Sequence, residues 1–118
     1  MLQGHESLAA ASLLQGGDGM VPGMANLAPA LFVHLQAAAD RGAAPECAEL
    51  QRQVTAIARI YQQGPWLSAL KAACAMLGLG NGRPAPPLTP ATPAAREAIA
   101  TLLDEAGVSA AAGATRSR

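Results

Sequence analysis

A glycine followed by two polar residues lies near the start of the sequence, at Gly4, His5 and Glu6. An imidazole can donate or accept a proton, and a carboxylate accepts hydrogen bonds from hydroxyl or ammonium groups. At the end of a strand, such a tripeptide can direct its side chains into a pocket. Without a strand before it, the same segment is an exposed chain end. The elements around the tripeptide therefore decide whether it is a binding segment.

The sequence offers one lysine and two cysteines as nucleophiles. A lysine that forms an imine must be neutral enough to attack a carbonyl carbon, through burial or a nearby cation. Lys71 follows Leu70 on an amphipathic segment and can extend its amine into water, so we expect a solvated lysine. Cys47 and Cys74 have no histidine base nearby in the sequence and are too few for a zinc site, so we expect buried free thiols in a reducing compartment. No catalytic residue is predicted.

The sequence predicts neither a metal site nor another cofactor. His34 has no second His or Cys three or four positions along its predicted helix. Gly16, Gly17 and Gly19 do not form the Gly-x-Gly-x-x-Gly pattern that opens a helix in dinucleotide sites. Asp18, which lies among these glycines, is typical of a turn.

The composition argues against several classes of function. Eight basic and eight acidic residues give a formal net charge of zero. Without a Lys/Arg cluster, we expect neither a nucleic-acid binder nor a membrane-surface module. No apolar run approaches the ~18 residues of a membrane span, and residues 1–7 lack the features of a signal peptide. We therefore expect a cytoplasmic protein, and its 29 alanines favour helices.

The first 26 residues predict a helix followed by a short strand. Residues 8–14 read as a helix that the glycines at 16 and 17 end. Residues 19–23 are a short apolar run with a glycine at each end and a proline inside, which favours a short buried or edge strand, or a strand that passes into a loop. A helix followed by a strand is half of a β/α repeat. Because a lone strand leaves its backbone groups unpaired, partner strands are expected.

The remaining sequence predicts helices with clear start and stop signals. They cover about residues 29–41 with Asn26 as a cap, 45–62, 65–77, and 92–106 with Thr92 as a cap. Their apolar faces are Leu31, Leu35 and Ala38; Leu50, Val54, Ile57 and Tyr61; Trp66, Leu70, Ala73 and Leu77; and Ile99, Leu102, Leu103 and Ala106. Residues 78–90 are rich in proline and predict an extended connector. Residues 108–118 predict a frayed tail.

An ordered set of motifs resembles one enzyme family. The segments Gly4 to Leu8 and Leu13 to Asn26 resemble the C-terminal part of the dihydrodipicolinate synthase / N-acetylneuraminate lyase family of class I pyruvate-dependent aldolases. The family pattern is glycine with acidic residues after strand seven, then a helix, a Gly-Asp-Gly turn, strand eight and Ala-Asn before helix eight. Further along, Arg41-Gly42, Leu70 to Ala73 and Arg83 to Leu88 resemble the appended helices and their proline-rich connector.

The resemblance implies the C-terminal part of a (β/α)8 TIM barrel plus appended helices, which as an isolated chain would be mostly α with one or two short strands. Residues 1–42 would hold the tip of strand seven, helix seven, strand eight and helix eight. Residues 43–107 would form the C-terminal helical extension, and residues 108–118 a disordered tail. Since such barrels need ~250 residues, the chain would match about the last two-fifths of a family member.

The resemblance also implies substrate-binding positions. Gly4 and Glu6 match the positions that bind the distal polar part of the substrate. Val21 matches the position whose backbone lies against the pyruvate-derived end of the substrate, and Gly23 matches a position that is serine in sialic-acid lyases. Ser7 replaces a second acidic residue of those lyases, so sialic acid itself is not expected.

Other family residues have no match in this sequence. The family uses a lysine on strand six as its Schiff-base nucleophile, a tyrosine on strand five as a proton relay, and a Thr/Ser-Thr-Gly segment near strand two. Lys71 matches a helical Leu-Lys pair and not the nucleophile, Tyr61 lies on an appended helix, and His5 stands where sugar-acid lyases often carry an aromatic residue.

The resemblance therefore implies a fragment of a carbon–carbon lyase or synthase that acts on pyruvate or a 2-keto-3-deoxy acid. We expect the fragment to be inactive by itself because its nucleophilic lysine is missing. The full-length protein would be a homo-oligomer, typically a tetramer. The alternative is a non-catalytic helical interaction or oligomerisation module.

Overall fold

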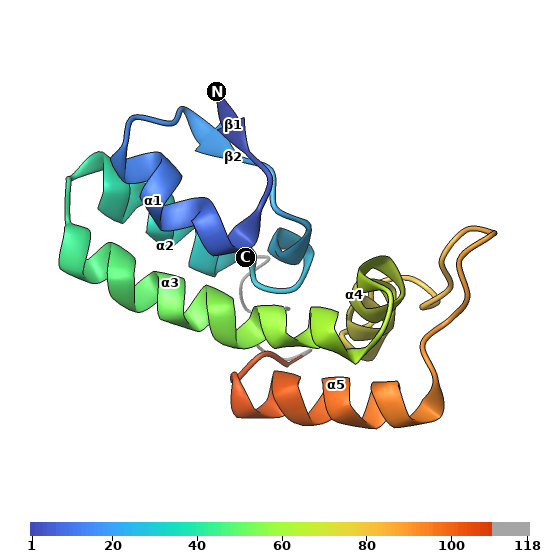
Figure 1. The fold of residues 1–118 in the computed structure, drawn as a ribbon. Coiled ribbons are helices and arrows are strands. Elements are labelled where there is room, and N and C mark those ends of the chain that lie inside the picture. Colours follow the sequence, from blue (N-terminus) through green and yellow to red (C-terminus); the bar gives the residue numbers. More distant parts are fainter. Residues whose placement is uncertain (110–118) are drawn as a thin grey trace. The chain divides into compact units, whose positions relative to one another are not determined.

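The computed structural model describes residues 1–109 and consists mainly of helices, with two short strands (Figure 1). In chain order the elements are β1 (Leu2–Gln3), η1 (Glu6–Leu8), α1 (Ala9–Leu14), β2 (Gly19–Met20), η2 (Gly23–Asn26), α2 (Pro29–Asp40), α3 (Ala44–Ala58), η3 (Arg59–Gln63), α4 (Trp66–Met76) and α5 (Pro93–Glu105); each η is a 3-10 helix. The chain forms two compact units, residues 1–56 and the residues from Ile57 onward.

The two strands pair in parallel, with Leu2 opposite Gly19 and Gln3 opposite Met20. The ladder continues into both flanking loops. The Asp18 N–H donates to the Met1 carbonyl at 3.0 Å, and the Val21 N–H donates to the Gln3 carbonyl at 2.8 Å. Because α1 connects two parallel strands, the segment is a β-α-β unit. The strand predicted within residues 19–23 is confirmed at Gly19–Met20, and β1 supplies a partner.

After β2 the structure differs from two predictions, the length of the strand and the capping role of Asn26. Residues 23–26 form the 3-10 turn η2, so the strand ends before Val21. Asn26 does not cap α2, because Ala28 stands at the N-cap. The Asn26 Nδ2 instead donates to the Gly23 carbonyl at 2.8 Å. The Asn26 side chain, which the sequence suggested as a helix cap, therefore forms a local hydrogen bond within the turn instead.

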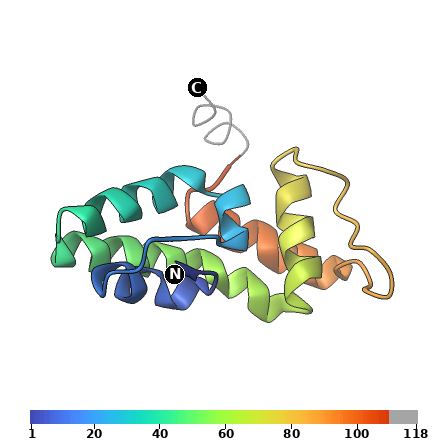
Figure 2. The same ribbon diagram turned by 90° about the horizontal axis from the view of Figure 1, so that it is seen from above.

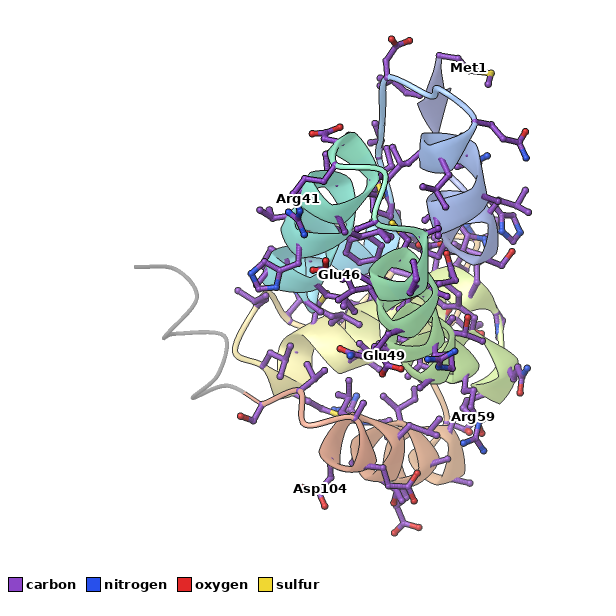
Figure 3. The ribbon with its side chains drawn as sticks, turned by 90° about the vertical axis from the view of Figure 1, so that its left-hand side faces the viewer. Met1, Arg41, Glu46, Glu49, Arg59 and Asp104 are labelled. Atoms are coloured by element: carbon purple, nitrogen blue, oxygen red, sulfur yellow. The ribbon has the colours of Figure 1, made fainter. Side chains whose placement is uncertain are left out.

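The first unit is built from α1, η2, α2 and the first part of α3. Figure 2 shows α1 alongside the first part of α3, and the Gln51 side chain joins the two helices by accepting from the Ala10 N–H at 2.9 Å. α2 ends with Arg41 and Gly42 as predicted, and Arg41 pairs with Glu46 at 2.6 Å (Figure 3). The buried apolar side chains of this unit are Ala9, Ala10, Leu13, Met24, Leu27, Ala28, Phe32, Leu35, Ala38, Cys47 and Val54.

The second unit packs η3 against α4 and α5. Thr92 caps α5 as predicted, since its Oγ1 accepts from the Ala95 N–H at 3.1 Å. The buried Ser68 Oγ donates to the Thr89 carbonyl at 2.6 Å and so ties α4 to the proline-rich connector, which holds no helix. The buried apolar side chains of this unit are Ile57, Ile60, Ala69, Leu70, Ala72, Ala73, Ile99, Leu102, Leu103 and Val108.

Four residues of the predicted apolar faces in the second unit are not fully buried: Trp66 is exposed, and Tyr61, Leu77 and Ala106 are half-buried. Trp66, predicted as buried, is 58% exposed, with its ring edge-on to Tyr61 at a centroid distance of 6.0 Å. As the first residue of α4 it projects toward the helix start, beyond the turns that pack. Ile60 is buried whereas Tyr61 is half-buried. At Arg59 the chain tightens to a 3-10 turn, which changes the residues that face the core.

The end of α5 also departs in part from the prediction. Val108, which we expected in a frayed tail, is buried, and its N–H donates to the Leu103 carbonyl at 2.9 Å. Gly107 adopts a positive φ of 71°, the left-handed turn that commonly ends a helix. The rest of the predicted tail, from residue 110, lies outside the described residues. Among the described helices, none combines the length and the apolar character that a bilayer crossing requires.

Candidate functional site

The carboxyl ends of β1 and β2 bring together the four residues predicted to bind substrate. Gly4 and Glu6 follow β1, and Val21 and Gly23 follow β2. The two segments approach closely, because a Cβ on Gly4 would stand 3.9 Å from the Val21 carbonyl oxygen. Ligands of parallel α/β proteins bind at the carboxyl ends of the strands. We call residues 4–7 and 21–24 the carboxyl edge.

Glu6 links the two segments of the carboxyl edge. Its Oε1 accepts a hydrogen bond from the Met24 N–H at 3.2 Å, which serves the first turn of η2. Its backbone carbonyl accepts from Gln51 Nε2 at 3.0 Å. The resemblance implies that the Glu6 carboxylate binds substrate. In the structure one of its oxygens instead joins η1 to η2.

Hydrogen bonds within the same segment fix His5, although the residue is exposed. Its N–H donates to Oε1 of Gln3 at 2.9 Å, and its carbonyl accepts from the Leu8 N–H at 3.0 Å. Its ring Nδ1 lies 2.8 Å from Ser7 Oγ. Sequence reasoning missed this pair, although the spacing of two residues could have suggested it.

The segment after β2 contributes backbone groups and the exposed Val21 side chain to the carboxyl edge. Val21 is 68% exposed and lies in the loop after β2, so the strand that passes into a loop is the alternative observed here. Gly23 opens η2, and its carbonyl accepts from the Asn26 side chain. Both residues are thus held by hydrogen bonds of their backbone, Val21 to Gln3 and Gly23 to the Asn26 side chain.

The nucleophilic side chains lie in other parts of the chain. Lys71 is exposed on α4, as predicted, and belongs to the second unit. Both cysteines are free; Cys47 is fully buried and Cys74 is half-buried. Burial raises the pKa of the Cys74 thiol, and the Lys71 charge only partly opposes it. Among residues 1–109, no group of three or more His, Cys, Asp or Glu side chains is placed to hold a metal ion.

A groove of about 490 Å³ lies between α1 and α3. Its lining residues are Ser7, Ala10, Ala11, Leu14, Ala44, Ala48, Gln51, Arg52 and Thr55. This groove was not predicted from the sequence, although alanines at helical spacing on both segments could have indicated a close approach of two helices.

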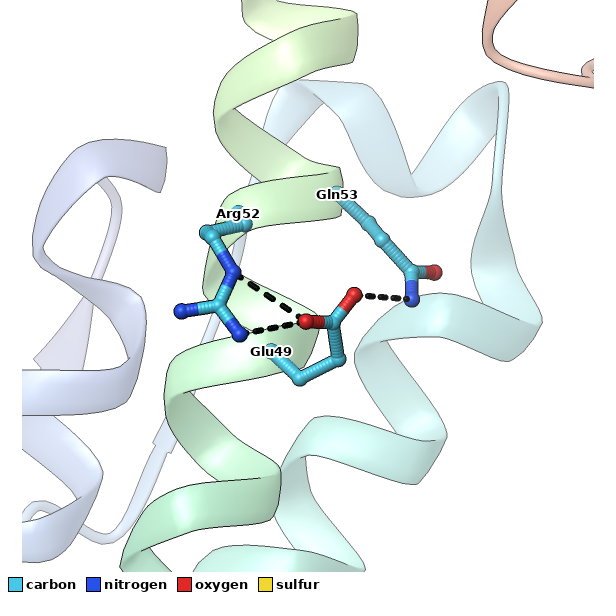
Figure 4. A network of polar contacts seen from close by, with 3 residues as sticks. All are labelled: Glu49, Arg52 and Gln53. Atoms are coloured by element: carbon cyan, nitrogen blue, oxygen red, sulfur yellow. Dashed lines mark hydrogen bonds and ion pairs between the residues drawn. The ribbon is translucent and has the colours of Figure 1, made fainter.

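The one charged side chain of this groove is engaged on α3. The Arg52 guanidinium pairs with Glu49, and Gln53 Nε2 donates to the other Glu49 oxygen at 3.4 Å (Figure 4). The Arg52 hydrogen bond is the main reason that the pKa of Glu49 lies below its ordinary value of 4.5. All three side chains are exposed, so the network belongs to the solvated face of α3.

Comparisons with known proteins find one family. The model of the dihydrodipicolinate synthetase family matches residues 1–106. The chain is 35% identical over 81 residues to an uncharacterized DapA-like lyase of Halobacterium salinarum, a match that covers 69% of this chain and 27% of that protein. The chain therefore matches about a quarter of the length of this curated relative.

Solved structures give the same result. The dihydrodipicolinate synthase of Bacteroides thetaiotaomicron is similar with a TM-score of 0.84 and 35% identity, over 89% of this chain and 37% of that chain. YagE, a prophage protein of E. coli K12 solved in complex with pyruvate, has a TM-score of 0.81 and 27% identity, over 91% and 37% of the two chains. A 2-keto-3-deoxygluconate aldolase variant of Sulfolobus solfataricus, with a TM-score of 0.78 and 21% identity over 89% and 36%, shares the fold.

Proposed function

The chain belongs to the dihydrodipicolinate synthetase family, and from this premise we propose that it forms the carboxyl-terminal part of a Schiff-base-forming carbon–carbon lyase or synthase. The substrate would be pyruvate or a 2-keto-3-deoxy acid. The observation that carries the proposal is the carboxyl edge, where Gly4, Glu6, Val21 and Gly23 meet at the ends of two parallel strands within the matched residues.

Residues 1–42 would close a (β/α)8 barrel, residues 43–107 would form its helical extension, and residues 108–118 its tail. The parallel β1–α1–β2 unit followed by α2 supports this assignment, because it repeats the β/α order of a barrel. Parallel sheets need cover on both faces, and Leu2 and Val21 are largely exposed here. Further strands of the barrel would cover them.

The carboxyl edge would orient the substrate rather than react with it. Gly4 lets the Val21 backbone approach, and Glu6 holds η2 and so the segment that starts at Gly23. Orientation by such fixed groups lowers the barrier of a reaction that occurs elsewhere in the site. No catalytic role falls to these four residues.

The imine-forming lysine would come from a part of the protein outside these residues. Lys71 is exposed on α4, whereas an imine-forming lysine needs burial or a neighbouring cation. We expect the 118 residues to be inactive without that part. The assembled protein would be a cytoplasmic homo-oligomer, by similarity a tetramer.

A helical interaction module without catalysis is the second candidate. The groove between α1 and α3 and the exposed Trp66 of α4 favour it, because exposed apolar surface and tryptophan are enriched where proteins associate. On this reading, the carboxyl edge would have no affinity for 2-oxo acids.

Borohydride trapping with pyruvate separates the two candidates. In a chimera, residues 1–109 replace the matching stretch of the Bacteroides thetaiotaomicron synthase, which keeps the upstream strands of that enzyme. We expect intact-mass spectrometry to show a reduced pyruvate adduct on the chimera and none on the 118-residue chain. Lys71→Arg in the chimera is the control and should leave trapping unchanged. A folded chimera without an adduct, or an adduct on Lys71, would contradict the proposal.

A further inference from the structure

The side-chain amide of Gln51 connects α3 with the start of α1. Its Oε1 accepts from the Ala10 N–H at 2.9 Å, and its Nε2 donates to the Glu6 carbonyl at 3.0 Å. The Ala10 N–H can only donate and the Glu6 carbonyl can only accept, so these two partners fix the orientation of the amide. One half-buried side chain thus forms two hydrogen bonds, to residues that lie 41 and 45 positions away in the sequence.

The two groups that Gln51 joins lie at the junction of η1 and α1. In a regular α-helix, an N–H such as that of Ala10 donates directly to the carbonyl four residues earlier, which here is that of Glu6. Instead, the residues from Glu6 to Leu8 form a 3-10 turn, and the Glu6 carbonyl accepts from the Ala9 N–H. A side chain that bridges such groups bends a helix at that point. The Gln51 amide therefore favours the 3-10 turn over a further α-helical turn at Glu6.

The two hydrogen bonds of Gln51 have different consequences. The Ala10 N–H belongs to the first turn of α1, where N–H groups need an acceptor from outside the helix, so this bond caps the helix. The Glu6 carbonyl already accepts from the Ala9 N–H, so the second bond is not needed to satisfy it. The second bond instead fixes the position of Glu6, whose carboxylate accepts from the Met24 N–H at 3.2 Å. Gln51 is thus connected through Glu6 to the segment after β2.

We infer that Gln51 is a positioning residue, which holds Glu6 and, through Glu6, residues 21–24 in the geometry that binds the pyruvate-derived end of the substrate. The inference rests on the proposed function, which places substrate at the carboxyl edge. It gives α3, which belongs to the proposed helical extension, a role in the site. Gln51 acts through Glu6 and does not itself contact the substrate.

Two substitutions separate the capping bond from the positioning bond. Gln51→Glu keeps an oxygen for the Ala10 N–H but has no N–H for the Glu6 carbonyl at neutral pH, and a negative charge near the start of α1 is favourable. Gln51→Met has a similar length and loses both bonds. The control is Gln62→Glu, which introduces the same charge at an exposed residue of η3.

Amide hydrogen exchange, followed by NMR in the 118-residue chain, tests the contacts. With Gln51→Glu we expect the Met24 N–H to exchange about three- to tenfold faster, the effect of one hydrogen bond, and the Ala10 N–H to keep its rate. With Gln51→Met both amides should exchange faster, and with Gln62→Glu neither. Thermal unfolding should give the same midpoint for Gln51→Glu and Gln62→Glu, so that the faster exchange is local.

The chimera described above tests the consequence for the substrate. Borohydride trapping over a range of pyruvate concentrations gives a half-saturating concentration and a maximal rate. We expect Gln51→Glu to raise the half-saturating concentration about three- to tenfold and to leave the maximal rate unchanged, because binding weakens while the reacting lysine is unaltered. A residue that only supports the fold would not separate these two quantities.

Unchanged exchange of the Met24 N–H with Gln51→Glu, or an unchanged half-saturating pyruvate concentration, would overturn the inference. A lower unfolding midpoint with uniformly faster exchange would do the same, because Gln51 would then only stabilise the fold. Failure of the proposed function has a different signature. In that case the chimera with Gln51 intact would not be trapped at any pyruvate concentration, whatever the exchange rates of its amides.

Discussion

The Glu6 carboxylate joins two segments that lie 18 residues apart in the sequence. Its acceptance from the Met24 N–H satisfies a part-buried backbone donor at the start of η2. Glu6→Ala leaves this donor without its acceptor, so we expect the free energy of unfolding to fall by about 1–2 kcal/mol in urea denaturation. Glu6→Gln keeps an acceptor oxygen and should lose less.

Glu49→Gln is the matched control for Glu6. This carboxylate is exposed and pairs with Arg52 on the same helix, and exposed ion pairs contribute little. We expect no resolvable change in the denaturation midpoint. Equal effects of Glu6→Ala and Glu49→Gln would show that the Met24 contact does not stabilise the carboxyl edge.

At the scale of elements, α5 depends on its capping residue. Thr92 Oγ1 accepts from the Ala95 N–H at 3.1 Å, and Pro93 follows at the first helical position. Thr92→Ala should lower the free energy of unfolding by about 1 kcal/mol, because a first-turn N–H loses its partner. Thr92→Ser keeps the hydroxyl and should be nearly neutral. Thermal unfolding followed by circular dichroism measures both, and equal losses would contradict the capping role.

The elements also show where a sequence pattern stops being informative. The helical spacing of Val54 and Ile57 correctly placed both in the core. It placed Tyr61 there too, but the tighter 3-10 turn from Arg59 buries Ile60 instead. The sequence carries no clear signal for this change of period, because the packing of η3 against α4 and α5 decides it.

At the scale of the whole molecule, the exposed apolar residues beside the strands predict self-association of the isolated chain. Leu2 on β1 is 63% exposed, and Val21, which follows β2, is 68% exposed. Within residues 1–109 each of the two strands pairs only with the other, and unpaired strand edges favour pairing with other chains. Sedimentation velocity should show concentration-dependent oligomers that the double change Leu2→Lys with Val21→Lys reduces. Leu79→Lys, at a residue that is 50% exposed in the second unit, should leave them unchanged. Equal effects would contradict an association through the strands.

The sequence by itself determined the family, the order of the elements and most of their ends, since these depend on local signals such as Gly42, Thr92 and Pro93. It also placed Gly4, Glu6, Val21 and Gly23 as one group, although their role in binding stays a prediction. Only the tertiary structure decided the partners of the polar side chains. The Glu6–Met24 and Gln51–Ala10 bonds join distant segments, and such pairs depend on how the elements pack, which no local pattern encodes.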